Sequence, residues 1–169
     1  FRPDATVKAN FAGSQSASML TYTAATWYFV AVARGTTQWT GDAGVSADGA
    51  ASFAFATTNN AVSTGASAID EFVIGGSTWA PNGLMNGEIC CVRVFSSRMS
   101  ASDLFIEMNS ATPVHASCIA NWRLANTTTG YLVDSVNGYT LTKTGTVNNG
   151  STEPTDIAAG ASAPLAQAQ

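Results

Sequence analysis

The stretch that decides the fold is residues 70–108, which read DEFVIGG at 70–76, PNGLMNG at 81–87, EICCVRVF at 88–95 and SSRMSASDL at 96–104. Short runs of β-branched and aromatic residues, such as those in the first and third of these segments, are typical of strands. Glycine and Asn-Gly pairs between such runs are turn signals. The stretch therefore predicts strand, glycine turn, strand, short loop and capped helix.

The helix near residues 100–109 is predicted from a capping box. The Ser100 hydroxyl can accept the amide hydrogen of Asp103, whose carboxylate can reach back to the amide of Ser100. Apolar residues then follow at helical spacing, namely Ala101, Leu104, Phe105 and Met108. We expect this to be the single helix of the chain.

Upstream, residues 27–34 read WYFVAVAR and form the clearest strand signal of that half. The run is apolar on both alternating faces, which predicts a central strand that is covered on both sides. Residues 45–55 resemble a hairpin whose turn is Asp48-Gly49, a pair favoured where both residues need positive φ. Residues 57–68 are polar and are predicted to form a loop.

Downstream, short strand signals occupy residues 119–124, 131–134 and 139–142, with an Asn-Gly hairpin pair at 137–138. About ten short strands with regular turns indicate an all-β fold, an antiparallel β-sandwich. We expect its core to bury Trp27 and Trp122.

The chain divides into one predicted domain, residues 1–153, and an Ala/Pro/Gln-rich arm or linker, residues 154–169. We expect the arm to dock on a neighbouring surface, because a segment of this composition has little to hold it in place by itself.

The composition is poor in charge. Of 169 residues, 11% are charged and 46% are apolar, and the net charge is -4; about 25% charged residues is usual in a globular domain. Lysine and arginine form no cluster, which argues against a nucleic-acid partner. No apolar run has the roughly 18 residues that a membrane helix needs.

The three cysteines are Cys90, Cys91 and Cys118. Side chains of strand neighbours point to opposite faces, so at most one of the adjacent pair is expected to reach Cys118. The alternative is that all three pack as small apolar thiols. A metal site is not predicted, because His115 is the only histidine.

The ordered set of signals resembles the laminin-G-like, concanavalin A-like jelly-roll superfamily. Such domains carry an aromatic strand, an Asp-Gly hairpin, an Ile-Gly-Gly strand end, an Asn-Gly turn, a Val-Arg-Val-aromatic strand and a Ser-initiated helix. The matching segments here are residues 27–31, 48–49, 74–76, 86–87, 92–95 and 99–103. The resemblance implies a jelly-roll sandwich.

A further likeness departs from the order of such domains. The Trp-x-Leu segment at 122–124, followed by Asp134 and Gly138, is similar to a segment that often opens them, but here it lies near the C-terminus. It is either a set of sandwich strands arriving late in the chain or the start of an appended half-module.

Candidate binding residues follow from this resemblance. Exposed aromatic rings beside Asn or Asp suit sugars, which makes Trp39 with Asp42, and Trp79 with Asn82, the candidate glycan site. The alternative is that both tryptophans cap the sandwich core. Some relatives bind calcium, which needs six to eight oxygen ligands; Asp42 and Asp48 are the candidates, with simple turn formation as the alternative. No other cofactor or metal is expected.

Catalysis is not expected. Glucanases of the superfamily place acids on one strand face in a Glu-x-Asp-x-x-Glu pattern, as glycoside hydrolysis requires, and this chain has no such triplet. Asp70 and Glu71 are adjacent, and because neighbours on a strand point to opposite faces, they make a poor pair of acid and nucleophile. No Gly-x-Ser-x-Gly elbow occurs, and His115 has no evident partner.

The resemblance leaves two kinds of function. The first is a structural module on the virion surface, a phage-like capsid decoration or fibre protein that docks on other protein subunits, including its own copies. The second is a carbohydrate-binding module of a secreted or cell-surface protein.

Overall fold

The computed structural model describes residues 6–7, 10–11, 14–15, 20–34, 40–61, 74, 88–124 and 132–142. In this part, every regular element except one short helix is a strand, which agrees with the predicted all-β fold class. The elements, in chain order, are β1 (Thr6–Val7), β2 (Asn10–Phe11), β3 (Ser14–Gln15), β4 (Leu20–Thr21), β5 (Tyr28–Arg34), β6 (Thr40–Ala47), β7 (Thr57–Ala61), β8 (Cys91–Phe95), α1 (Ala101–Met108) and β9 (Cys118–Arg123). The predicted strand at 72–74 and the arm at 154–169 lie outside the described residues, apart from position 74.

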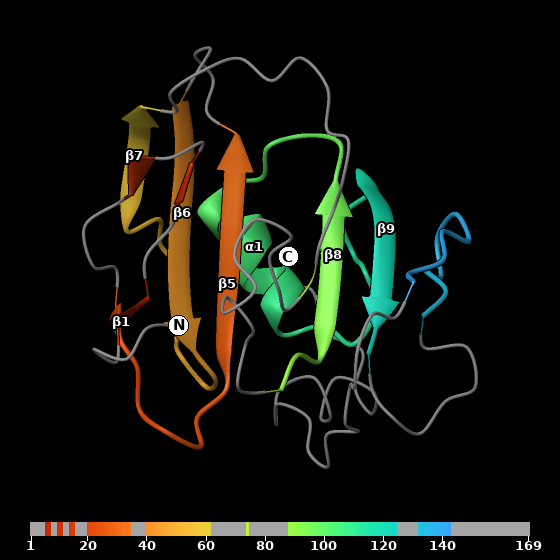
Figure 1. The fold of residues 1–169 in the computed structure, drawn as a ribbon, viewed down its shortest axis with the longest axis horizontal. Coiled ribbons are helices and arrows are strands. Elements are labelled where there is room, and N and C mark those ends of the chain that lie inside the picture. The colour runs from red at the N-terminus through yellow and green to blue at the C-terminus, as the bar shows by residue number, and fades with distance from the viewer. Residues whose placement is uncertain are drawn as a thin grey trace, which may run out of the picture.

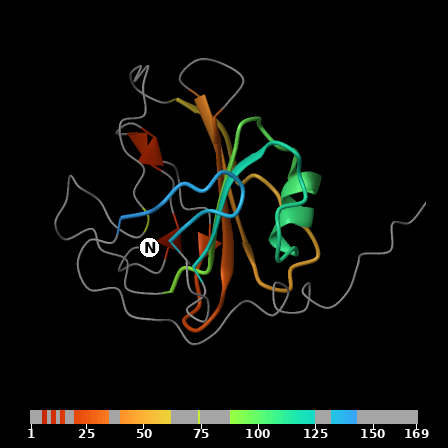
Figure 2. The ribbon, with the colours of Figure 1, turned by 90° about the vertical axis from the view of Figure 1, so that its right-hand side faces the viewer.

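All strand pairs in the described residues are antiparallel. The larger sheet has the order β5-β6-β7, the second sheet pairs β8 with β9, and the two-residue strands pair as β1 with β4 and β2 with β3. Figures 1 and 2 show β5 beside β8, with α1 packed across one face of both sheets. The helix side of this layer therefore holds the core.

The strand predicted at residues 27–34 is β5, but only one of its faces is buried. Ala31 is buried against the helix side, whereas Val30 and Val32 are 45% and 62% exposed. The prediction of cover on both faces was wrong. Apolar residues on a strand need not all be buried, because apolar atoms make up much of any folded surface.

The predicted turn at Asp48-Gly49 is present, but the return strand is not where the sequence placed it. Only Gly49 of the pair has positive φ, at 75°, so this is not the turn type that needs positive φ at both residues. The chain then runs back over β6, where Ser46 Oγ donates to the carbonyl of Ser52 and the amide of Ala56 donates to the carbonyl of Ala43, before β7 pairs with the other end of β6. The polar loop predicted at 57–68 was therefore wrong for residues 57–61, where backbone pairing overrides polar side chains.

A glycine on β6 permits this crossing. A Cβ atom built on Gly44 would lie 2.5 Å from the carbonyl oxygen of Ala54 and 2.6 Å from the ring of Phe53. Both atoms belong to the crossing segment, so the backbone passes too close to β6 for any side chain.

We expect Gly44→Ala to destabilise the fold by about 2 kcal/mol, within the usual cost of overpacking. Urea unfolding followed by tryptophan fluorescence measures this, with Gly49→Ala as a comparison, where the added methyl group meets open space and only the positive φ is strained. A stability unchanged in Gly44→Ala would contradict the close approach.

The helix begins at the predicted capping box. The amide of Asp103 donates to Ser100 Oγ at 3.1 Å, and the amide of Ser100 donates to Asp103 Oδ2 at 3.4 Å. The Ser100 hydroxyl also donates to Asp103 Oδ2 at 2.7 Å, and this bond holds the pKa of Asp103 below its usual value. The capping prediction is confirmed.

Replacing Ser100 by alanine removes this cap, and we expect it to cost about 1 kcal/mol, the usual value for an N-cap. Ser97→Ala, at an exposed serine in the loop before the helix, serves as the control. Equal melting temperatures for the two variants would contradict a stabilising role for the box.

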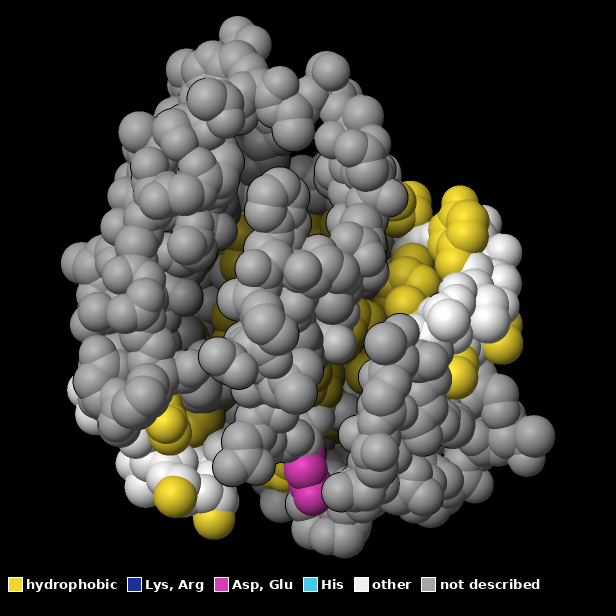
Figure 3. Space-filling model, in the orientation of Figure 1, with side chains coloured by type: hydrophobic (Ala, Val, Ile, Leu, Met, Phe, Trp, Pro, Cys, Tyr) yellow, Lys and Arg dark blue, Asp and Glu magenta, His cyan; other side chains and the backbone are white. Residues whose placement is uncertain are grey.

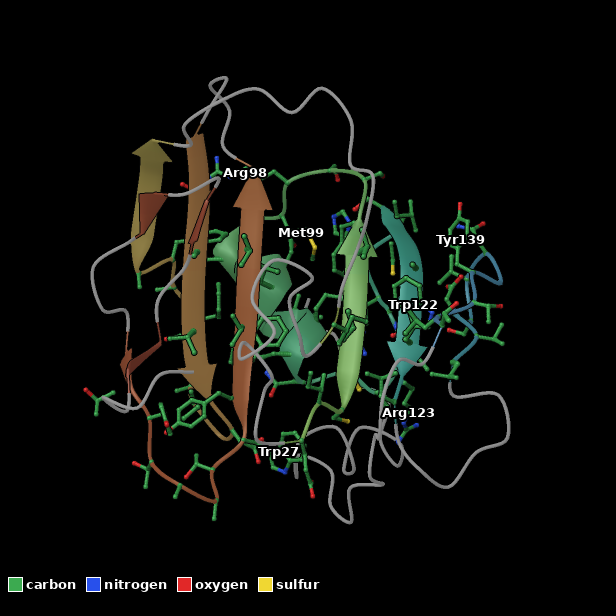
Figure 4. All side chains as sticks on the ribbon, in the orientation of Figure 1. Trp27, Arg98, Met99, Trp122, Arg123 and Tyr139 are labelled. Carbon is green, nitrogen blue, oxygen red and sulfur yellow. The ribbon has the colours of Figure 1, made fainter. Side chains whose placement is uncertain are left out.

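The core cluster joins the helix to both sheets. It consists of the buried residues Ala31, Phe53, Met99, Leu104 and Met108, with Phe29, Phe55, Phe95 and Phe105 packed against it. Phe53 makes edge-to-face contacts with both Phe29 and Phe55. Trp122 is buried, at 5% exposed, as predicted, but Trp27 is only half-buried and lies near one end of β5 (Figure 4).

Candidate functional site

Of the residues predicted to bind a glycan, the structure describes Asp42, while Trp39, Trp79 and Asn82 lie outside the described residues. The side chain of Asp42, on β6, is only 1% exposed and forms an ion pair with Arg98. Its carboxylate therefore already has a cationic partner. The loop before α1 supplies that partner, and the pair ties this loop to the larger sheet.

A hollow lies beside this ion pair. It has a volume of about 500 Å³ and is lined by Phe55, Arg98, Met99, Ser100 and Ala101. The Arg98 side chain is 41% exposed, and its guanidinium lies 5.7 Å from the centre of the Phe55 ring. The hollow thus offers a planar cation and an aromatic ring, and Figure 4 labels Arg98 and Met99, which lie in the segment between β8 and α1.

The calcium candidates gain no support from the geometry. Asp42 is held by Arg98, and Asp48 lies half-buried in the turn after β6. Within the part of the chain that the structure describes, no three His, Cys, Asp or Glu side chains group closely enough to hold a metal ion.

A buried charge network joins β8 to the end of α1. The side chains of Arg93 and Glu107 are 8% and 1% exposed, and Arg93 Nη1 lies 2.7 Å from Glu107 Oε2. Arg93 also donates to the carbonyl oxygens of Glu107 and Ser110, at 2.7 and 2.5 Å, and to Asn121 Oδ1 at 3.1 Å. One guanidinium therefore connects β8, α1, β9 and the loop after the helix.

The other oxygen of Glu107 fixes that loop. Glu107 Oε1 accepts the amide hydrogens of Val114 and His115, at 2.8 and 2.6 Å. The His115 ring packs edge-on against Phe95, and its Nδ1 lies 2.7 Å from Ser117 Oγ. The expectation that His115 has no partner was wrong, since a neighbouring serine supplies one.

A second buried acid, Asp134, organises the hairpin after β9. Its Oδ1 accepts the amides of Asn121 at 3.0 Å and Val136 at 2.7 Å, and its Oδ2 accepts those of Asn137 at 3.1 Å and Tyr139 at 2.8 Å. Burial acts to raise the pKa of Asp134, but these amide donors outweigh it and hold the pKa below its ordinary value.

The same hairpin covers the outer edge of β9. Asn121 is bonded at both backbone groups, its amide to Asp134 and its carbonyl to the amide of Ser135 at 3.0 Å. The carbonyl of Ile119 accepts from Asn137 Nδ2 at 2.7 Å, and Trp122 Nε1 donates to the carbonyl of Tyr139 at 3.1 Å. This arrangement gives a physical reason for the Trp-x-Leu and Asp-x-x-x-Gly pattern of the sequence.

Apolar side chains gather on the surface of this region. Four of them, which we call the β9 patch, are 39–57% exposed: Ile119, Val133, Val136 and Tyr139. Figure 3 shows a yellow area over β9 and the 132–142 hairpin, and Figure 4 places Tyr139 on the outer side of this region. Exposed apolar side chains that gather in this way are typical of interaction surfaces.

The cysteines follow the alternative without a disulfide, but the adjacent pair lies differently from the prediction. None of the three is in a disulfide, yet Cys90 Sγ lies 3.2 Å from Cys91 Sγ. The expectation that these two side chains face opposite ways was wrong, because β8 begins at Cys91 and the alternation of a strand does not apply to the residue before it.

Comparisons with protein-family models, with curated proteins and with solved structures find no match to this chain. In the described part of the chain, nothing forms a helix with the length and hydrophobicity needed to span a bilayer.

Sequence reasoning missed three of the residues that matter here. Glu107 could have been found, because it lies three residues after Leu104 and so falls on the buried face of the helix. Arg93 carried no comparable local signal, since Glu107 is 14 residues away. Asp134 did carry one, since three of its four amide donors lie two to five residues further along the chain.

Proposed function

We propose that this chain is a non-catalytic interaction module that docks on other protein subunits through the β9 patch. The observation that carries the proposal is the exposure of four apolar side chains, Ile119, Val133, Val136 and Tyr139, on β9 and on the hairpin at its edge, in a charge-poor chain. Docking removes such apolar surface from water, which is the main favourable term in most protein association.

The buried charged groups support a non-catalytic role. Ion pairs join Arg93 to Glu107 and Arg98 to Asp42. Backbone groups supply further hydrogen-bond partners to Arg93, Glu107 and Asp134. Each holds one element of the fold against another. A catalytic acid or base must instead reach a substrate.

The finer proposal is that the chain is a laminin-G-like jelly-roll sandwich on the surface of a virion, such as a phage-like capsid decoration or fibre. Its support is the order of strand, turn and helix signals between residues 27 and 108 and the antiparallel pairing with one short helix. A symmetric protein shell presents many equal docking sites, which suits a module with an apolar patch.

The solution mass, measured by light scattering over a range of concentrations, tests the docking. We expect the chain to associate and the double variant Val136→Ser/Tyr139→Ser to lower its mass. Val114→Ser is the matched control, because Val114 is 60% exposed and lies outside the patch. A chain that is monomeric at every concentration, or a control that acts like the patch variant, would contradict self-association through the β9 patch.

The C-terminal arm is tested in the same way. We expect removal of residues 154–169 to weaken association and to leave the melting temperature nearly unchanged, because the composition of this segment suits an arm and not a core. A shortened chain that unfolds at a lower temperature would contradict this division.

A second candidate function is carbohydrate binding, which the hollow beside Phe55 and Arg98 favours. Aromatic rings and planar hydrogen-bond donors are the groups that hold sugars. A glycan array with the chain and its Trp39→Ala, Trp79→Ala and Arg98→Ala variants tests this candidate. Binding lost in the tryptophan variants would favour the lectin function over the docking module, and an array without binding would exclude the sugars it carries.

A further inference from the structure

The two adjacent thiols converge at the start of β8. Their sulfur atoms lie 3.2 Å apart, Cys90 is buried at 7% exposed, and Cys91 is half-buried. Cys90 therefore sits inside the fold, and Cys91 is the more accessible of the two. This is the geometry in which a reagent meets one thiol first and finds the second beside it.

We propose that Cys90 and Cys91 are a dithiol that a small disulfide such as oxidised glutathione converts into a disulfide between adjacent residues. The Cys91 thiolate attacks one sulfur of the oxidant and expels a glutathione thiolate. The Cys90 sulfur then attacks Cys91 Sγ of the mixed disulfide and expels the glutathione that it carried. The two electrons reduce the oxidant, and the two thiol protons leave with the two glutathione molecules.

Cys118 is not expected to form a disulfide with Cys90 or Cys91. It pairs with Phe95, at the opposite end of the β8–β9 ladder from the pair of Cys91 with Arg123. Its Sγ donates to the carbonyl of Ala120 at 3.3 Å, and burial raises the pKa of its thiol. Since the thiolate is the reacting form, a raised pKa slows exchange at Cys118.

Disulfide formation is expected to disturb the end of the β8–β9 ladder at which Cys91 pairs with Arg123. Bonded sulfurs are about 2 Å apart, and adjacent Cα atoms lie about 3.8 Å apart, below the usual span of a disulfide. The ring must therefore distort the backbone at Cys90 and Cys91. The carbonyl of Cys90 accepts the amide of Leu124 at 2.6 Å, so this bond is the first to be disturbed. Strained disulfides are readily reduced, which makes the change reversible.

The full chain, treated with oxidised glutathione, tests the proposal by mass spectrometry. We expect the intact mass to fall by two hydrogen atoms, about 2 Da. Trypsin cleaves after Arg34, Arg93, Arg98 and Arg123, which places Cys90 and Cys91 together in the peptide 35–93 and Cys118 in the peptide 99–123. The loss of two hydrogen atoms must be confined to the peptide 35–93. Two peptides joined through Cys118, or a stable glutathione adduct without the loss, would overturn the proposal.

Two serine variants sharpen the result. Cys118→Ser, the matched control, is expected to lose the two hydrogen atoms as the unchanged chain does. Cys91→Ser is expected to lose none. In the unchanged chain, oxidation is expected to speed hydrogen exchange at the Leu124 amide by about tenfold, as local opening of a strand end does, and dithiothreitol is expected to restore it. If oxidation left the hydrogen-exchange rate of the Leu124 amide unchanged, the predicted effect on the β8–β9 ladder would be overturned.

Discussion

Replacing Arg93 by methionine is expected to destabilise the protein by about 3–5 kcal/mol, the usual cost of removing one partner of a buried ion pair. The variant leaves the Glu107 carboxylate, 1% exposed, without its counter-charge. It also leaves the carbonyls of Glu107 and Ser110 and the Asn121 side chain without the donor that they share. We expect the melting temperature to fall by about 10 °C.

Urea unfolding followed by tryptophan fluorescence measures the loss. Arg123→Met is the control: Arg123 is also an arginine on this sheet, but it is exposed, so its replacement should cost at most about 1 kcal/mol, the upper end for an exposed charge. Equal unfolding midpoints for Arg93→Met and the unchanged chain would show that the network contributes nothing.

A double variant separates the pair from its other contacts. In Arg93→Met/Glu107→Leu the buried charges are both gone, so the loss should be smaller than the sum of the two single losses. Some loss should remain, because Glu107 Oε1 also accepts the amides of Val114 and His115. A fully additive result would mean that the two side chains act independently.

The parts of the fold that the sequence predicted well are those set by local chemistry. The capping box at Ser100 and Asp103 depends on residues three apart, and the structure has it. The runs at β5 and β8 are rich in valine and aromatic residues, and each is a strand. Such signals are complete within a few residues, so no distant partner is needed to interpret them.

The parts that were missed depend on distant segments. The residues of β7 are polar and form a strand only because β6 presents its backbone to them. Arg93 gave no signal of burial, because an arginine on a strand usually meets water, but its side chain lies against α1 and forms the ion pair with Glu107. Gly44 gave no turn signal, because its role is to admit a segment from ten residues further along the chain.

The same contrast applies to the candidate sites. The aromatic and acidic side chains chosen from the sequence were selected by chemical type, and the one that the structure describes beside the hollow, Asp42, is buried against Arg98. The β9 patch has no signal in sequence, because its members come from a strand and a hairpin that meet only in the fold.

The second large effect is expected at Asp134. At neutral pH, Asp134→Asn should cost about 3 kcal/mol, the scale of a hydrogen bond to a charged group. The amide group that replaces one carboxylate oxygen is a donor, and it would face the amide hydrogens of Val136 or Tyr139, which now bind oxygen. The edge of β9 at Asn121 would lose its cover.

The loss of stability in Asp134→Asn is expected to depend on pH, and the lowered pKa of Asp134 determines the direction of that dependence. The native carboxylate has a pKa below its ordinary value, and an unfolded aspartate has a pKa of about 3.9. The stabilisation is therefore fully present above about pH 5 and is lost as pH falls through the native pKa. The stability difference between the unchanged chain and Asp134→Asn should be constant from about pH 7 to pH 5 and should shrink below that.

Urea unfolding at a series of pH values measures this difference directly. Glu88→Gln is the control, because it removes an exposed carboxylate, and it should change the pH profile far less than Asp134→Asn does. A difference for Asp134→Asn that is the same at acidic and neutral pH would show that the shape of the side chain, and not its charge, holds the hairpin. A difference that shrinks on acidification places the charge itself at the edge of β9, where it keeps that strand covered beside the proposed docking patch.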